Sequence, residues 1–279
     1  VGDTTAIMLG SALDMTFMDF FWYHGRPSIF FAVELGALLS AAIIYVLFRK
    51  EKASVHGFGQ MTQVSDYMPT FLLGGMVVLL ICASFAPDSW NLPPETNGII
   101  CCALLLVGLI YNTVRKKTVK AVLGPLNAID FETLGLLVGL FLMIGGITHE
   151  GVIDALAHLL VELGGGNLFL MYTLIVWASV LISAFIDNIP YVATMIPVIA
   201  RIAAEMGVDS TALYFGLLSG ATLGGNCTPI GASANIAGIG ILRKEGYQVA
   251  NKDFFRIGIP FTMAAVIPAY IFIWLVFGV

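Results

Sequence analysis

The sequence Gly-Gly-Asn-Cys-Thr-Pro-Ile-Gly occupies residues 224–231 and interrupts an apolar stretch that runs from residue 212 to residue 242. Glycine, asparagine and threonine are poor helix formers, and a proline in a helix interior costs about 3 kcal/mol. A helix therefore cannot pass through these residues unbroken. The apolar flanks predict a discontinuous helix over residues 212–242 that lies in a membrane, where irregular backbone must be buried in protein or line a cavity.

The composition of the whole chain also indicates a membrane protein. Of its 279 residues, 58% are hydrophobic and 11% are charged, with a mean hydropathy of +0.92, whereas soluble proteins carry about 25% charged residues. A membrane span takes about 20 apolar residues, and five stretches approach or exceed that length: 29–48, 70–86, 98–114, 132–147 and 254–277. No amphipathic, charge-rich surface helix of a soluble fold is visible. The predicted fold class is an all-α polytopic membrane protein.

The basic residues predict the orientation of the spans. Eleven of the thirteen Lys and Arg residues fall in three clusters, which the positive-inside rule assigns to the cytoplasm. The clusters are Arg49, Lys50 and Lys52; Arg115, Lys116, Lys117 and Lys120; and Arg243, Lys244, Lys252 and Arg256. The other gaps between spans carry acids and are assigned outside. We expect a multi-pass protein of a prokaryotic inner membrane, in contact with lipid, with its C-terminus outside.

Residues 167–206 form two apolar arms around Asp187-Asn188-Ile189-Pro190. Both arms end in acidic gaps that are assigned outside. This pattern favours a re-entrant hairpin with residues 187–190 at its tip, although two fully crossing arms would give the same orientation for the rest of the chain.

Two parts of the chain resemble each other. Residues 1–7 (Val-Gly-Asp-Thr-Thr-Ala-Ile) align with residues 230–236 (Ile-Gly-Ala-Ser-Ala-Asn-Ile), and an Asp-Phe-Phe, Gly and Pro series in residues 19–27 returns in residues 253–260. The helices that follow are assigned opposite directions, which indicates an inverted repeat, as in many secondary transporters. The predicted organisation is the end of the first repeat (1–50), two connecting scaffold helices with a basic loop (51–130) and the second repeat (131–279). The first repeat has no counterpart of residues 130–229, so we expect it to be truncated at its N-terminus.

Ions and substrates of inverted-repeat transporters bind near the membrane midplane, where broken helices present N–H and C=O groups. Three segments qualify: the hairpin tip, the break, and the start of the first repeat. The candidate ligands are Asp187, Asn188 and Pro190; Asn226, Thr228, Pro229, Gly231, Ser233 and Asn235; and Gly2, Asp3, Thr4 and Thr5. Polar packing between helices is the alternative role for the neutral residues.

Asp187 is the strongest single candidate, because a carboxylate inside a membrane costs at least about 2.5 kcal/mol. It can bind Na+ together with Asn188 and Asp3, carry a proton, or cap the helix that follows. The four cysteines and the histidines lack the spacing of metal ligands. We therefore expect no metal centre, no cofactor and no nucleic-acid partner.

The segments Ser-Ala-Phe-Ile-Asp-Asn-Ile-Pro-Tyr-Val-Ala-Thr-Met-Ile-Pro (183–197) and Gly-Gly-Asn-Cys-Thr-Pro-Ile-Gly-Ala-Ser-Ala-Asn (224–235) resemble the ion transporter superfamily. Within it they look most like the branch of arsenite permeases and the melanosomal P protein. The resemblance implies a homodimeric secondary transporter with a moving transport domain and a fixed scaffold. The implied substrate is a small inorganic ion or oxyanion, coupled to H+ or Na+. In the dicarboxylate branch the hairpin tips carry Ser-Asn-Thr, and this tip departs from that pattern at residues 187–189.

Other functions stay open at this point. A sodium/proton antiporter or a dicarboxylate or citrate transporter of the same superfamily are alternatives, and a passive channel is a third. An intramembrane aspartyl protease could use Asp3 and Asp187, but such enzymes carry Tyr-Asp and Gly-x-Gly-Asp motifs, which this sequence lacks. We predict that the protein is not an enzyme.

Overall fold

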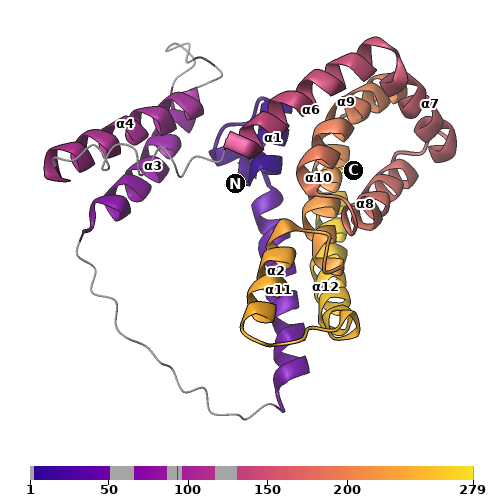
Figure 1. The fold of residues 1–279 in the computed structure, drawn as a ribbon. Helices are drawn as coiled ribbons and strands as arrows, with labels where there is room; N and C mark the ends of the chain where they lie inside the picture. The colour runs from indigo at the N-terminus through magenta and orange to yellow at the C-terminus, as the bar shows by residue number, and fades with distance from the viewer. Residues whose placement is uncertain (1–2, 51–65, 87–92, 94–95, 117–130, 279) are drawn as a thin grey trace. The chain divides into compact units, whose positions relative to one another are not determined.

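The computed structural model describes residues 3–50, 66–86, 93, 96–116 and 131–278. The described chain is built almost entirely of α-helices (Figure 1), which confirms the predicted class. It divides into two compact units: one comprises Val1–Met15, Asp19–Lys52 and Leu137–Val279, and the other comprises Thr16–Met18 and Ala53–Leu136. The domain boundaries drawn from the repeat stay a prediction.

The first unit contains most of the helices. They are α1 (Thr4–Ala12), α2 (Ile29–Phe48), most of α6 (Phe131–His149), α7 (Val152–Gly164), α8 (Leu168–Ser183), α9 (Asn188–Met206), α10 (Thr211–Gly224), α11 (Ser233–Lys244) and α12 (Asn251–Phe277). A 3-10 turn, η3 (Gly225–Cys227), follows α10. The short 3-10 turn η1 (Met18–Phe20) and an antiparallel pair of two-residue strands, β1 (Trp22–Tyr23) and β2 (Arg26–Pro27), precede α2; the sequence analysis did not predict these strands.

Four described helices are long and apolar enough to cross a membrane: α2, α4 (Thr96–Lys116), α9 and α12. A fifth span results if α6 and α7 count as one, since Val138–His149 and Val152–Gly164 meet at a bend of 72°. The bend is made at Gly151, whose φ of 74° is a conformation that glycine adopts without strain. The arm α9 is long enough to cross, while α8 has only 16 residues, so the re-entrant form of the hairpin stays a prediction.

The core of the first unit is centred on α10, whose residues 211–221 are all buried. This helix packs against α8, α9 and α12 (Figure 1). Glycines on one face of α10 allow the close contact with α8. A Cβ at Gly220 would lie 2.5 Å from the carbonyl oxygen of Val176, and one at Gly224 would lie 2.7 Å from Cα of Val180. Small residues at four-residue spacing allow backbones to approach in this way.

The helices α2 and α12 pack along each other and run antiparallel (Figure 1). Ser40 Oγ donates to the carbonyl of Phe261 at 2.9 Å, and a Cβ at Gly36 would lie 2.8 Å from the carbonyl oxygen of Ala265. Nearer the start of α2, Arg26 donates to the carbonyl of Val276 at 2.5 Å. An inverted repeat requires α2 and α12, the equivalent helices of the two repeats, to run in opposite directions, as they do. The inverted repeat itself stays a prediction.

Two ion pairs join α7 to α9. Arg201 Nε lies 2.8 Å from Asp154 Oδ1, and His158 Nδ1 lies 3.0 Å from Glu205 Oε1. The pair of His158 and Glu205 lies four residues after the pair of Asp154 and Arg201 on both helices, so α7 and α9 run parallel there. All four side chains are at least partly exposed, and such pairs contribute about 0–1 kcal/mol each.

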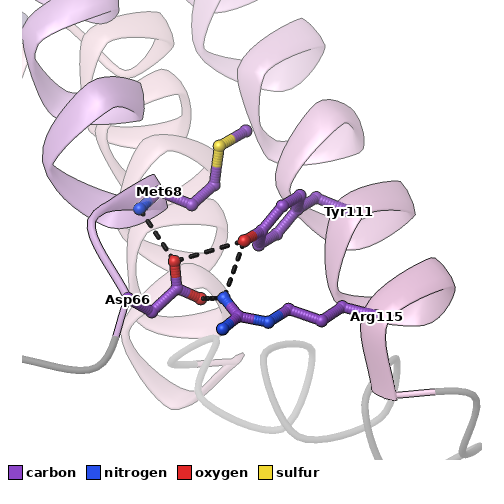
Figure 2. Close-up of polar contacts among 4 residues, drawn as sticks. All are labelled: Asp66, Met68, Tyr111 and Arg115. Carbon is purple, nitrogen blue, oxygen red and sulfur yellow. Dashed lines mark hydrogen bonds and ion pairs between the residues drawn. The ribbon is translucent and has the colours of Figure 1, made fainter.

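The second unit contains α3 (Met68–Ser84), which begins with Pro69 in its first turn, α4 and the first residues of α6. Figure 2 shows the hydrogen bonds and the ion pair that connect the start of α3 to the end of α4. Asp66 accepts from the backbone N–H of Met68 at 2.9 Å, lies 2.6 Å from Arg115 Nη1 and accepts from Tyr111 Oη at 3.3 Å. The Met68 N–H, with the Arg115 charge and Tyr111 hydroxyl as further causes, lowers the pKa of Asp66 below its ordinary value of 3.8. The helices are therefore antiparallel and tied at one end.

Candidate functional site

The predicted hairpin tip is the turn between α8 and α9. Ser183 ends α8, and Asp187 is the N-cap of α9, where its Oδ1 accepts from the backbone N–H of Ile189 at 3.1 Å. The side chain of Asp187 is otherwise exposed. Asp187 thus has the capping role that asparagine and aspartate favour at helix starts, and its charge is left available to a further partner.

The predicted break is also present. The helix α10 ends at Gly224, η3 turns the chain, and α11 starts at Ser233. Gly225 N–H bonds to Leu223 O rather than closing the next helical turn onto Ala221 O. The end of a broken helix leaves such carbonyls without their helical donors.

The tip and the break meet in one cluster, the tip–break cluster, formed by Ser183, Ala184 and Asn188 of the tip and Gly225, Thr228, Gly231 and Asn235 of the break. The hydroxyl of Thr228 donates to Ala184 O, and Asn235 Nδ2 donates to Gly225 O at 3.1 Å and to Thr228 O at 3.0 Å. A Cβ at Gly231 would lie 2.6 Å from Gly225 O and 2.7 Å from Ala184 O. Only glycine permits backbones to approach so closely.

Ser183 is a member of this cluster that the sequence analysis did not select. Its buried Oγ lies 2.5 Å from both Asn188 Oδ1 and Ala221 O. A hydroxyl has one hydrogen, so it donates to one of these oxygens at a time. Ser183 is the first residue of the motif at residues 183–197 and lies five residues before Asn188. This spacing does not indicate a contact with α10, so the sequence could not have identified Ser183 as a site residue.

The cluster offers both donors and acceptors to a ligand. Asn235 uses both hydrogens of Nδ2 on carbonyls, so its Oδ1 remains an acceptor. Asn188 contacts Ser183 through Oδ1, and its Nδ2 donates to no group among the residues that the structure describes. Carbonyl, amide and hydroxyl oxygens suit a hard cation, and amide or hydroxyl donors suit an oxyanion. Among the described members of the cluster, none has a charged side chain.

The remaining predicted residues of the tip and break lie beside the cluster without a side-chain hydrogen bond to it, within the part of the chain that the structure describes. Pro190 accepts from Thr194 Oγ1 inside α9. The carbonyl of Asn226 faces Gly258 of α12, 2.8 Å from where a Cβ would stand. Pro229 is half-buried, and Ser233 is exposed at the start of α11.

The start of the chain forms a separate polar group. Thr5 is buried and its hydroxyl donates to Asp3, the N-cap of α1, and Thr4 is half-buried. The helix α1 packs against α9 and α10, but no described side chain of residues 3–5 bonds to the tip–break cluster. Gly2 lies outside the described residues.

Comparison with known proteins identifies the family. The family model described as CitMHS, citrate transporter, matches residues 1–220 and 109–279. The chain is 31% identical over 278 residues to an uncharacterized transporter of Mycobacterium bovis and 30% identical over 279 residues to a 46 kDa membrane protein of Mycobacterium leprae. In both cases the match covers 99% of this chain and 63% of the relative. The chain thus spans less than two thirds of the length of these relatives.

A shorter match is found with the human P protein, which is 37% identical over 142 residues, 48% of this chain and 17% of that protein. No solved structure matches the chain. The relatives from Mycobacterium bovis and from Synechocystis sp. are both named transporters. With the family match extending over its whole length, the chain belongs to the citrate transporter family of the ion transporter superfamily.

Proposed function

We propose that this chain carries substrate-binding residues of a secondary active transporter for a small inorganic ion or oxyanion, coupled to H+ or Na+. The observation that supports the proposal is the tip–break cluster, in which two interrupted helical segments bring amide, hydroxyl and carbonyl groups together. Such interruptions are found in transporters where a substrate or coupling ion binds. The arsenite-like specificity rests on the resemblance of the tip and break motifs.

The chemistry of the cluster favours a small ligand. Its described side chains are amides and hydroxyls, which can surround an ion or an oxyanion but supply no positive charge to balance a tricarboxylate. The family description favours citrate or a dicarboxylate as the second candidate. Sodium/proton exchange is the third, and the exposed carboxylate of Asp187 at the tip supports it. The protein is proposed to act as a homodimer in a prokaryotic inner membrane with its C-terminus outside.

Fluxes through proteoliposomes that contain the complete protein test this proposal. Arsenite, chloride, Na+ and citrate are offered in turn, with and without a pH gradient and a Na+ gradient. We expect movement of one inorganic ion that depends on one of the two gradients. Gradient-driven citrate uptake without inorganic ion flux would establish the second candidate instead, and a flux that no gradient can drive uphill would indicate a channel.

The role of Asp187 is tested with two variants. Asp187→Asn retains a capping side chain but removes the charge, so we expect unchanged stability and a loss of coupled flux. Asp209→Asn is the matched control, since Asp209 also accepts from the first turn of a helix, the N–H of Thr211 at 2.7 Å, but belongs to the turn between α9 and α10 and not to the hairpin tip. Equal fluxes in the wild type and Asp187→Asn would remove Asp187 from the site.

A further inference from the structure

The turn that joins α11 to α12 forms an open cleft with a positive charge. It has a volume of about 550 Å³ and is lined by Arg243, Gly246, Tyr247, Gln248 and Val249. The cleft lies at the C-terminal end of α11, whereas Asn235 of the tip–break cluster lies near its start, and the two share no residue.

The shape of the cleft follows from how α11 ends. Gly246 has a φ of 87°, and the backbone N–H groups of Gly246 and Tyr247 bond back to the carbonyls of Arg243 and Leu242 at 3.1 and 2.9 Å. This is the Schellman ending of a helix, which requires glycine at the left-handed position. The chain then runs on without helix or strand as far as Ala250, and the N–H groups of Gln248 and Val249 bond to no group of the described chain. Arg243, Gln248 and Val249 line a common opening.

Exposed apolar side chains lie on and next to the turn. Tyr247, which lines the cleft, is 65% exposed, and Ile241 and Leu242 at the end of α11 and Phe255 at the start of α12 are also exposed. Lys244, Lys252 and Arg256 add positive charge on both sides of the turn, against Glu245 and Asp253. A soluble anion would need the positive charge but not the exposed apolar side chains. A phospholipid needs both, because its phosphate and its acyl chains are adjacent.

We propose that this cleft binds the phosphate headgroup of an anionic phospholipid. Arg243 forms the ion pair with the phosphate, Gln248 and the free backbone N–H groups donate hydrogen bonds, and Ile241 and Tyr247 contact the upper acyl chains. An aromatic side chain with a polar tip and a guanidinium are the residue types that occupy this depth of a bilayer.

The test measures binding of a fluorescent short-chain phosphatidylglycerol to the purified protein in detergent, with phosphatidylcholine of the same chain length as the comparison. We expect Arg243→Gln to weaken phosphatidylglycerol binding about fivefold, the effect of one basic residue near a lipid phosphate. Lys50→Gln is the matched control, because Lys50 is an exposed basic residue predicted on the same membrane face but outside the cleft. We expect this variant to change binding less than twofold.

Three results would overturn the proposal. Arg243→Gln could bind phosphatidylglycerol as tightly as the wild type, or Lys50→Gln could weaken it equally, which would indicate general attraction to positive charge. Inorganic phosphate could also displace the lipid and bind the delipidated protein with the same affinity, which would make the cleft a site for soluble anions. The measurement does not depend on transport, so its failure would leave the proposed function intact.

Discussion

The substitution Gly231→Ala tests whether the tip and the break form one unit. An added methyl group would lie 2.6 Å from Gly225 O and 2.7 Å from Ala184 O, and both are backbone atoms. Ordinary contact begins at 3.4 Å, so one or both carbonyls would have to move by roughly 0.7 Å. Neither can turn away as a side chain could.

We expect this overpacking to cost about 1–3 kcal/mol. At about 2–4 °C per kcal/mol for a protein of this size, a cost near 2 kcal/mol lowers the melting temperature by about 4–8 °C. Transport should fall at least about tenfold, since displacement of binding groups by a fraction of an ångström is costly. Melting is measured by tryptophan fluorescence in detergent, and transport is measured in proteoliposomes as an initial rate.

The matched control is Gly238→Ala. Gly238 lies on α11, seven residues after Gly231, is exposed and has nothing within 4 Å of an added Cβ. Alanine is favoured over glycine in a helix by about 0.8–1 kcal/mol, so this variant should melt at the same temperature or higher and transport normally. If Gly231→Ala behaved like Gly238→Ala, the close contact between tip and break would be refuted.

Three other changes have defined outcomes. Ser183→Ala removes a buried hydroxyl that contacts Asn188, so melting in detergent should show a loss of about 1–3 kcal/mol, and the KM for the transported ion should rise; an unchanged KM would argue against a positioning role. Because the backbone N–H of Met68 and the charge of Arg115 lower the pKa of Asp66, the stability that this carboxylate contributes is present above pH 3.8 and is lost as the pH falls below it; the difference in melting between the wild type and Asp66→Asn should be found at pH 6 and shrink as the pH falls below 3.8. Gly36→Ala places a Cβ 2.8 Å from a carbonyl of α12 and should lower the melting temperature while the KM of the folded protein is retained, whereas a changed KM would link this contact to the site.

Local sequence patterns predicted most of the helices. The span at residues 29–48 coincides with α2, and those at 70–86, 98–114, 132–147 and 254–277 agree with α3, α4, α6 and α12 to within three residues at either end. The break was predicted because proline and glycine interrupt a helix wherever they occur. The cap at Asp187 was one of three roles that the sequence left open. The spans, the break and the cap each depend on a few neighbouring residues, so they could be predicted from a single sequence.

Contacts between distant segments could not be predicted in the same way. Nothing in residues 183–188 indicates that Ser183 reaches Ala221 or that Ala184 accepts from Thr228. The glycines at 225 and 231 predicted a break, but their close approach to each other depends on how α8, α9 and α10 pack. The two short strands at residues 22–27 were missed, because four residues provide no recognisable alternation.

The packing of α2 on α12 also limits how this protein can change in evolution. Ala32, Gly36 and Ser40 face α12 because they recur at four-residue intervals. Inserting one residue between Ala32 and Leu35 would rotate the remainder of the contact face by about 100° and place Leu35 and Leu39 against the backbone of α12, where Gly36 and Ser40 now lie. The helix would still be long and apolar enough to span a membrane. Natural variants should therefore show many substitutions on the outer face of α2 but conserve its number of residues between Arg26 and Ser40.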